Sequence, residues 1–194
     1  MIGPTLAAIA LSFALAMPAA AEIGDDGLHK QDWFSITFRD IAEDIQDASA
    51  EGKRLAIIFE QRGCIYCTRM HQELLVDPEV RDFVEANFKI VQYNMFGDEE
   101  VTDLDGEVLT EKTAARKWGY VFTPTIVFLP DEAPAEGSVP EAAVATMPGA
   151  FGKWTFLHMF QWVADKGYEN GEHFQKYHAR KLNELREQGR TDVE

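Results

Sequence analysis

The most informative part of the sequence runs Leu55-Ala-Ile-Ile-Phe-Glu60, Gln61-Arg-Gly63, Cys64-Ile-Tyr-Cys67 and Thr68-Arg-Met-His-Gln-Glu-Leu-Leu75. It begins with a short apolar run rich in β-branched and aromatic side chains, which is typical of a buried strand, and Gly63 ends that run. After the cysteines, Met70, Leu74 and Leu75 recur at helical spacing with Cys67. The segment therefore predicts a strand followed by a helix, with both cysteines in the first helical turn.

That placement has a chemical consequence for the two cysteines. The free N–H groups and the dipole of a helix N-terminus stabilise an anion. A cysteine at this position therefore ionises more easily and becomes a better nucleophile. The Cys-x-x-Cys spacing also lets the thiol of Cys67 reach back to Cys64 and close a disulfide within the same turn.

Other uses of a cysteine pair fit this sequence less well. Haem attachment needs a histidine directly after the second cysteine, where the chain has Thr68. A structural zinc site needs four ligands, and the nearby candidates are Cys64, Cys67 and His71. A purely structural disulfide would close a very small loop and restrain little of the unfolded chain. We therefore expect no metal and no cofactor beyond a redox-active Cys64–Cys67 disulfide.

Composition indicates one acidic globular domain. The chain has 194 residues, 46% of them hydrophobic, with a formal net charge of -15. This length can bury a sizeable core. The acidic balance argues against nucleic-acid binding, which needs a basic face.

The N-terminus has the features of a targeting segment. Residues 6–17 are apolar but too short to span a bilayer comfortably, and Ala19-Ala20-Ala21 supplies a cleavage motif. We expect a signal peptide at 1–21, cleaved between Ala21 and Glu22, although its first residues lack Lys and Arg and an uncleaved anchor remains the alternative. The mature protein would then work outside the cytoplasm, in the periplasm, where disulfides persist.

The rest of the chain alternates helical and strand patterns. Phe38, Ile41, Ile45 and Ala48 predict one face of a helix, and Asp77-Pro78 predicts the start of another. Asp105-Gly106 indicates a hairpin turn. We further expect strands at 88–95, 125–129 and 144–147, helices at 111–118 and 151–163, a loop at 130–141, and a C-terminal helix from Phe174.

This order of elements resembles the thioredoxin fold over residues 36–168. The resemblance is carried by Cys64-Ile-Tyr-Cys67, by Thr123-Pro124 before a strand, and by Gly149-Ala150 before a helix. It implies an α/β protein whose central mixed β-sheet is flanked by helices. The domains expected are the signal peptide, an N-terminal extension at 22–35, the thioredoxin-like domain at 36–168 with an acidic hairpin insert at 97–117, and a C-terminal helix and tail at 169–194.

In that family the proline before the third core strand is cis and faces the cysteines, whereas a plain strand-start proline is the alternative. A cis Pro124 would leave the backbone of Thr123 free to pair with an extended substrate. The resemblance also implies that Cys64 attacks a substrate disulfide and Cys67 resolves the mixed disulfide. The residues expected to line the apolar substrate surface are Ile65, Tyr66, Phe122, Thr123, Pro124, Pro148 and Gly149.

Two positions depart from ordinary thioredoxins. The buried strand carboxylate of that family falls at Ile58, and its Gly-Pro dipeptide is Ile65-Tyr66. Glu60, two residues beyond Ile58, is a candidate modulator of the thiols, but we expect its side chain on the opposite face of the strand. His71 is a second candidate, four residues after Cys67, although a solvated helix position is the commoner role.

A closer resemblance is to SoxW-type periplasmic thioredoxins of bacterial sulfur oxidation. It implies a monomeric protein that reduces a disulfide-bearing periplasmic partner, such as a sulfur-oxidation carrier protein. A membrane thiol transporter would donate the electrons that return this protein to its dithiol form. A periplasmic disulfide isomerase or oxidase, or a non-catalytic binding module, remains an alternative. The segments that carry the likeness are Phe59-Glu-Gln-Arg-Gly-Cys-Ile-Tyr-Cys67, Asp77-Pro-Glu-Val80, Val91-Gln-Tyr-Asn-Met-Phe-Gly-Asp98, Val101-Thr-Asp-Leu-Asp-Gly-Glu107 and Ala115-Arg-Lys-Trp-Gly-Tyr-Val-Phe-Thr-Pro-Thr125.

Overall fold

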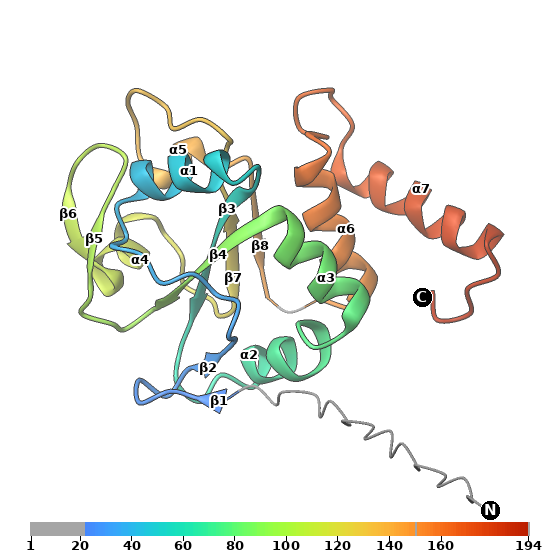
Figure 1. Ribbon diagram of the computed structural model, residues 1–194, viewed down its shortest axis with the longest axis horizontal. Coiled ribbons are helices and arrows are strands. Elements are labelled where there is room, and N and C mark those ends of the chain that lie inside the picture. Colours follow the sequence, from blue (N-terminus) through green and yellow to red (C-terminus); the bar gives the residue numbers. More distant parts are fainter. Residues whose placement is uncertain (1–21, 150, 194) are drawn as a thin grey trace, which may run out of the picture.

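A computed structural model describes residues 22–149 and 151–193 of the chain. The signal peptide expected at 1–21 lies outside the described residues. The central feature is a four-stranded mixed sheet in the order β4-β3-β7-β8 (Figure 1). Strands β3 (Arg54–Glu60) and β4 (Phe88–Asn94) run parallel, while β7 (Thr125–Phe128) and β8 (Ala145–Pro148) are antiparallel to their neighbours.

Strand β3 occupies the centre of the sheet and is buried along its whole length. In its register Ile57 pairs with Val91 on one side and with Val127 on the other. Both faces of such a strand are covered, which explains why its sequence is continuously apolar rather than alternating. Ala56 and Ile58 belong to one hydrophobic core, and the odd-numbered residues from 55 to 59 belong to the other.

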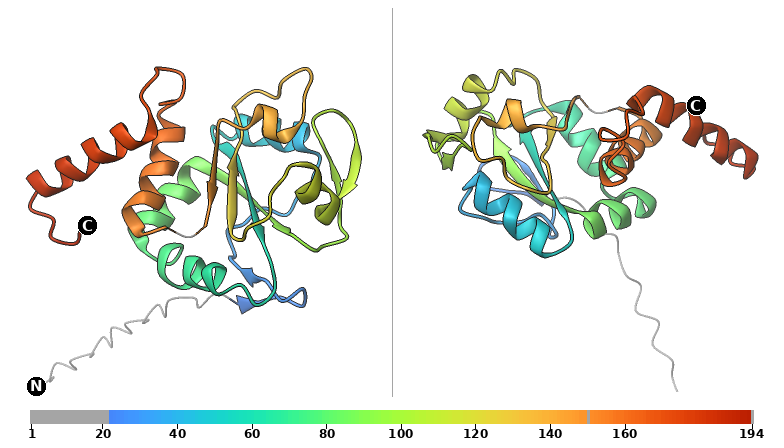
Figure 2. Two further views of the ribbon diagram at one scale, coloured as in Figure 1. Left: turned by 180° about the vertical axis from the view of Figure 1, so that it is seen from behind. Right: turned by 90° about the horizontal axis from the view of Figure 1, so that it is seen from above.

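Helices cover both faces of the sheet (Figures 1 and 2). The core that contains Ile58 lies under the π-helical turn η1 (Met70–Leu74), which continues α2 (Ile65–Arg69), and under α3 (Pro78–Asn87) and α6 (Lys153–Ala164). The core that contains Phe59 lies under α1 (Ile41–Ala50), α4 (Glu111–Lys117) and α5 (Val139–Ala142). The central mixed sheet flanked by helices confirms the predicted α/β thioredoxin-like fold.

The hairpin insert forms where the sequence places it. Strands β5 (Glu100–Thr102) and β6 (Val108–Thr110) pair antiparallel, and Gly106 adopts a φ of 82° in the turn between them. Lys117 at the end of α4 bonds to Asp103, Asp105 and Glu107 at 2.6–2.8 Å. These ion pairs hold the hairpin against α4.

The two ends of the described part of the chain also form regular elements. Strands β1 (Glu22–Ile23) and β2 (His29–Lys30) make a small hairpin, after which Ser35 N–H donates to the carbonyl of Ile90 on β4 (2.7 Å). At the other end, α7 (Phe174–Glu187) packs on α6 and projects away from the sheet (Figure 2). None of the helices in the described ranges is long and apolar enough to cross a membrane.

Three local expectations are wrong. Phe38 does not lie on the first helix, which begins at Ile41 after its N-cap Asp40; Arg39 has a φ of 58° and Phe38 is exposed. The loop expected at 130–141 includes the start of α5, which Ser138 and Glu141 cap. Helix α6 begins at Lys153 rather than at residue 151.

Candidate functional site

Cys64 is the N-cap of α2. Its Sγ accepts a hydrogen bond from the N–H of Cys67 (3.0 Å), and the N–H of Thr68 donates to its carbonyl (3.0 Å). The two cysteines form a disulfide with a Cα–Cα distance of 5.2 Å. The sulfur of Cys64 thus sits among the free N–H groups of a helix start, where a thiolate is stabilised.

The two sulfurs differ in accessibility. Cys64 is 7% exposed, whereas Cys67 is 1% exposed and faces the core under α2. A large partner can therefore reach Cys64 but not Cys67. This asymmetry agrees with Cys64 as the attacking thiol and Cys67 as the resolving thiol.

The loop before β7 faces Cys64. The Thr123–Pro124 peptide bond is cis, the isomer expected from the sequence. The Sγ of Cys64 lies 3.5 Å from the carbonyl oxygen of Thr123. Gly149, with a φ of 97°, donates its N–H to the carbonyl of Pro124 (2.7 Å) and joins the two loops at this end of the sheet.

Exposed apolar side chains surround the disulfide. Ile65 is 73% exposed, Tyr66 56% and Phe122 68%. Of the other residues expected on this surface, Pro148 is exposed, Thr123 and Gly149 are partly exposed, and Pro124 is buried. Val121, which the sequence analysis did not select, is also exposed and precedes Phe122. Such a rim suits an extended partner segment with apolar side chains.

The expectations for Glu60 and His71 are wrong. Residues two apart in a strand share a face, so Glu60 points to the same side as Ile58 rather than to the opposite one. His71 is completely buried instead of solvated, and its Nε2 lies 2.8 Å from Oε1 of Glu60, which is also completely buried. The two candidate modulators therefore form a buried pair between β3 and η1.

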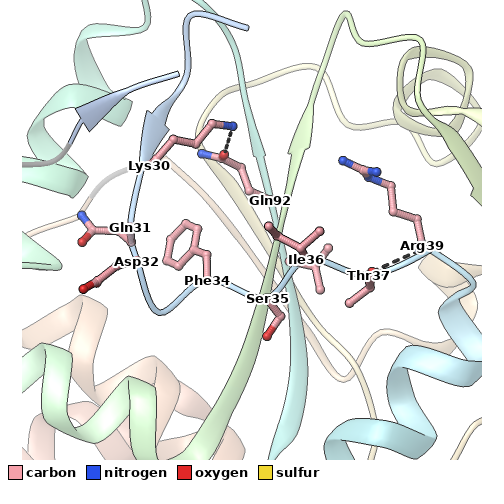
Figure 3. Close-up of a pocket in the computed structure, with 10 residues that line it drawn as sticks. Lys30, Gln31, Asp32, Phe34, Ser35, Ile36, Thr37, Arg39 and Gln92 are labelled. Atoms are coloured by element: carbon pink, nitrogen blue, oxygen red, sulfur yellow. Dashed lines mark hydrogen bonds between the residues drawn. The ribbon is translucent and has the colours of Figure 1, made fainter. Parts of the chain in front are cut away.

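The N-terminal extension completes the surroundings of this pair. Gln31 places its Nε2 3.1 Å from Nδ1 of His71, and Gln92 Nε2 donates to Oε1 of Glu60 (2.9 Å). Figure 3 shows the extension and the bond from Lys30 Nζ to Oε1 of Gln92 (2.8 Å). With Gln31 as the donor, His71 carries its proton on Nε2 and donates it to Glu60.

A second chain of hydrogen bonds joins the extension to the redox helix. His29 Nε2 lies 2.9 Å from Oγ1 of Thr68, whose hydroxyl donates to the carbonyl of Cys64 (3.2 Å). The ring of His29 stacks on that of His71, with centroids 5.3 Å apart. Burial, followed by the proximity of His71, lowers the pKa of His29 below its ordinary value.

The sequence analysis missed the partners that lie far along the chain from the cysteines. Gln31 and His29 come from the extension and Gln92 from β4, so no local spacing connects them to Glu60. Thr68 could have been noticed, because it lies four residues after Cys64 on the same helix. The available signal for Glu60 was a charged side chain at the end of a continuously apolar strand, which requires a buried partner.

The chemistry of the site centres on a disulfide. In the parts of the chain that the structure describes, no cluster of three or more His, Cys, Asp or Glu side chains could hold a metal ion. The chemically distinctive feature is the Cys64–Cys67 disulfide beside Thr123.

Comparisons with known proteins agree with this geometry. A thioredoxin-fold protein from Helicobacter pylori has 19% sequence identity and a TM-score of 0.56, with 75% of this chain and 97% of that chain covered. A thioredoxin from Thermus thermophilus has 26% identity and a TM-score of 0.51, with 66% of this chain and 86% of that chain covered. No curated protein matches the sequence. The model of the thioredoxin-like domain family matches residues 41–149, more than half of the chain, and the protein belongs to that family.

Proposed function

We propose that this protein reduces a disulfide in a partner protein outside the cytoplasm, and that the partner serves bacterial sulfur oxidation. Membership of the thioredoxin-like family and a Cys-x-x-Cys pair support thiol–disulfide oxidoreductase chemistry in general. The observation that carries the proposal is the position of Cys64. Its Sγ is the accessible sulfur at the start of α2 and lies 3.5 Å from the carbonyl oxygen of Thr123.

The reaction begins from the dithiol form. The Cys64 thiolate attacks one sulfur of the partner's disulfide, so a Cys64–partner S–S bond forms as the partner's S–S bond breaks. The first partner sulfur leaves as a thiolate and takes a proton from solvent. The N–H groups at the start of α2 stabilise the attacking anion, and the backbone before Pro124 positions the partner segment.

Cys67 completes the reduction. Its thiolate attacks Sγ of Cys64, the second partner sulfur leaves as a thiolate, and that thiolate also takes up a proton. The partner gains two electrons and two protons, and this chain ends as the Cys64–Cys67 disulfide. A membrane thiol transporter would return two electrons and two protons to restore the dithiol.

The charges near the motif support a reductant. Strong stabilisation of the thiolate favours the dithiol form and makes an oxidant. Arg69, close to the motif on α2, is already paired with Glu73 (2.8 Å). The segment from Leu55 to Leu75 contains no Lys, and its other arginine, Arg62, lies against Gly27 of the N-terminal hairpin. Thiolate stabilisation therefore rests mainly on the helix N-terminus.

Trapping experiments test the assignment of the two cysteines. Cys67→Ser should accumulate mixed disulfides with a partner, because the second step is blocked, whereas Cys64→Ser should form none and reduce no disulfide. Gel analysis under non-reducing conditions, with reversal by dithiothreitol, measures the adducts. Adducts that accumulate on Cys64→Ser instead would reverse the assignment.

A further inference from the structure

A groove lies beside the redox site and is not used by the chemistry described above. Its volume is about 280 Å³. Its apolar lining comes from the end of β4, from α4 and from the loop that leads to Pro124. The side chains that form it are Met95, Phe96, Ala115, Tyr120 and Val121. Phe96 and Val121 are 62% and 70% exposed, so the groove opens to solvent.

The charged residues that line this groove are both basic. Lys112 and Arg116 lie four residues apart on α4, which places them on one face of the helix. Both side chains are exposed. A basic edge is unusual on a chain with a formal net charge of -15.

Neither of these cations has an internal partner. Most Lys and Arg side chains in the described ranges lie within 4.0 Å of a carboxylate, as the pairs Lys117–Asp105 and Arg69–Glu73 illustrate. The described cations that have no such carboxylate are Arg62, Lys112, Arg116, Lys176 and Arg186. Lys112 and Arg116 therefore remain available to a carboxylate from outside the chain.

The groove adjoins the place where the disulfide of a partner protein would lie during attack by Cys64. Val121 lies two residues before Thr123, whose carbonyl oxygen is next to Cys64. Among the backbone hydrogen bonds of the described residues, none uses the N–H groups of Val121, Phe122 or Thr123. An extended segment can pair with this backbone, and at about 3.3 Å per residue its side chains two to three positions from the reactive cysteine reach the groove.

We propose that this groove selects partners whose disulfide is flanked by an apolar residue and an acidic residue. The apolar side chain fills the space between Phe96 and Val121, and the Asp or Glu pairs with Lys112 and Arg116. This inference rests on the proposed function and specifies its substrate class. Because the net charge of the protein repels acidic partners at long range, the selection acts at contact, within about 10 Å at 0.1 M salt.

Two matched peptides test the groove. Each peptide contains one intramolecular disulfide and, at the same position in both, a leucine as the apolar residue that fills the groove. The peptides differ at one residue, three positions from the attacked cysteine, which is Glu in one peptide and Lys in the other. The reduced wild-type protein should act on the Glu peptide with a kcat/KM about three- to tenfold higher, the range expected from one or two exposed ion pairs. Raising the salt concentration should shrink the difference.

The variant Lys112→Glu/Arg116→Glu should reverse this preference. The matched control is Lys176→Glu/Arg186→Glu, which changes the net charge equally but alters exposed cations on α7 that have no carboxylate within 4.0 Å. The control should keep the wild-type preference. Reduction of hydroxyethyl disulfide, a small neutral substrate, checks that the cysteine pair of each variant is intact. If the double Glu variant does not fold, Lys112→Gln/Arg116→Gln should abolish the preference without reversing it.

The outcomes separate the two proposals. Equal rates on both peptides in the wild type, with no effect of the α4 substitutions, would overturn the groove assignment and leave the reductase function intact. Failure of the wild-type dithiol to reduce either peptide or hydroxyethyl disulfide would overturn the proposed function itself.

Discussion

Replacing His71 by Leu should strongly destabilise the protein, because it removes the partner of a buried carboxylate. Glu60 and His71 are both fully buried, and Nε2 of His71 lies 2.8 Å from Oε1 of Glu60. After the substitution, Oε1 keeps only the bond from Gln92, while Oε2 has no partner in the structure. Removing the hydrogen-bond donor of a buried carboxylate costs about 3 kcal/mol, and we expect a loss of that size.

Glu60→Gln is the matched control for this prediction. The amide keeps the shape of the side chain and can still bond to His71, so we expect a smaller loss of about 1–2 kcal/mol. In the double variant Glu60→Gln/His71→Leu, the carboxylate itself is absent, so no buried carboxylate lacks a partner. The loss of stability in the double variant should therefore be smaller than the sum of the two single losses, which a double-mutant cycle measures directly.

Urea denaturation of the oxidised proteins provides the assay, because the Cys64–Cys67 disulfide fixes the redox state in every variant. The free energies of unfolding should follow the order wild type, Glu60→Gln, double variant, His71→Leu, from most to least stable. A cost below about 1 kcal/mol for His71→Leu, or strictly additive losses, would show that Glu60 and His71 are not a coupled buried pair.

Two further predictions concern the fold and the processing of the chain. Burial raises the pKa of Asp44 to about 6, above its ordinary 3.8, so the folded state binds this proton more tightly than the unfolded state does. The free energy of unfolding should therefore decrease as pH rises from about 4 to about 6. Asp44→Asn should remove this pH dependence and stabilise the protein at pH 7 by up to about 3 kcal/mol in thermal or urea unfolding, and an unchanged pH profile in the variant would contradict the prediction. Intact-mass analysis of the exported protein should show an N-terminus at Glu22, and retention of residues 1–21 in that form would contradict the signal-peptide prediction.

The order of elements could be predicted because it depends on local pattern. β3 is a continuous apolar run since the central strand has no solvent-facing side. The redox pair follows from its spacing and from the helix that begins behind Cys64. The hairpin was predictable because Asp105-Gly106 supplies the residue with a positive φ that the turn requires.

The surroundings of the site could not be predicted in the same way, because distant segments build them. His71 is buried by contacts with Phe34 and Gln31, some forty residues away in sequence. The face of Glu60 is predictable, because the two-residue period of a strand places Glu60 on the same face as Ile58. Whether Lys112 and Arg116 have partners depends on every carboxylate near them on the folded surface.

If Cys64 and Cys67 work as a reductant, their disulfide must be hard to reduce, and the reduction potential of the pair measures this property. Equilibration of the wild-type protein with glutathione redox buffers, followed by quantification of the dithiol and disulfide forms, gives this potential. We expect a potential of roughly −270 to −220 mV, near that of thioredoxins and glutaredoxins. A potential above about −150 mV would place the protein among the disulfide oxidants and rule out a role as a reductant.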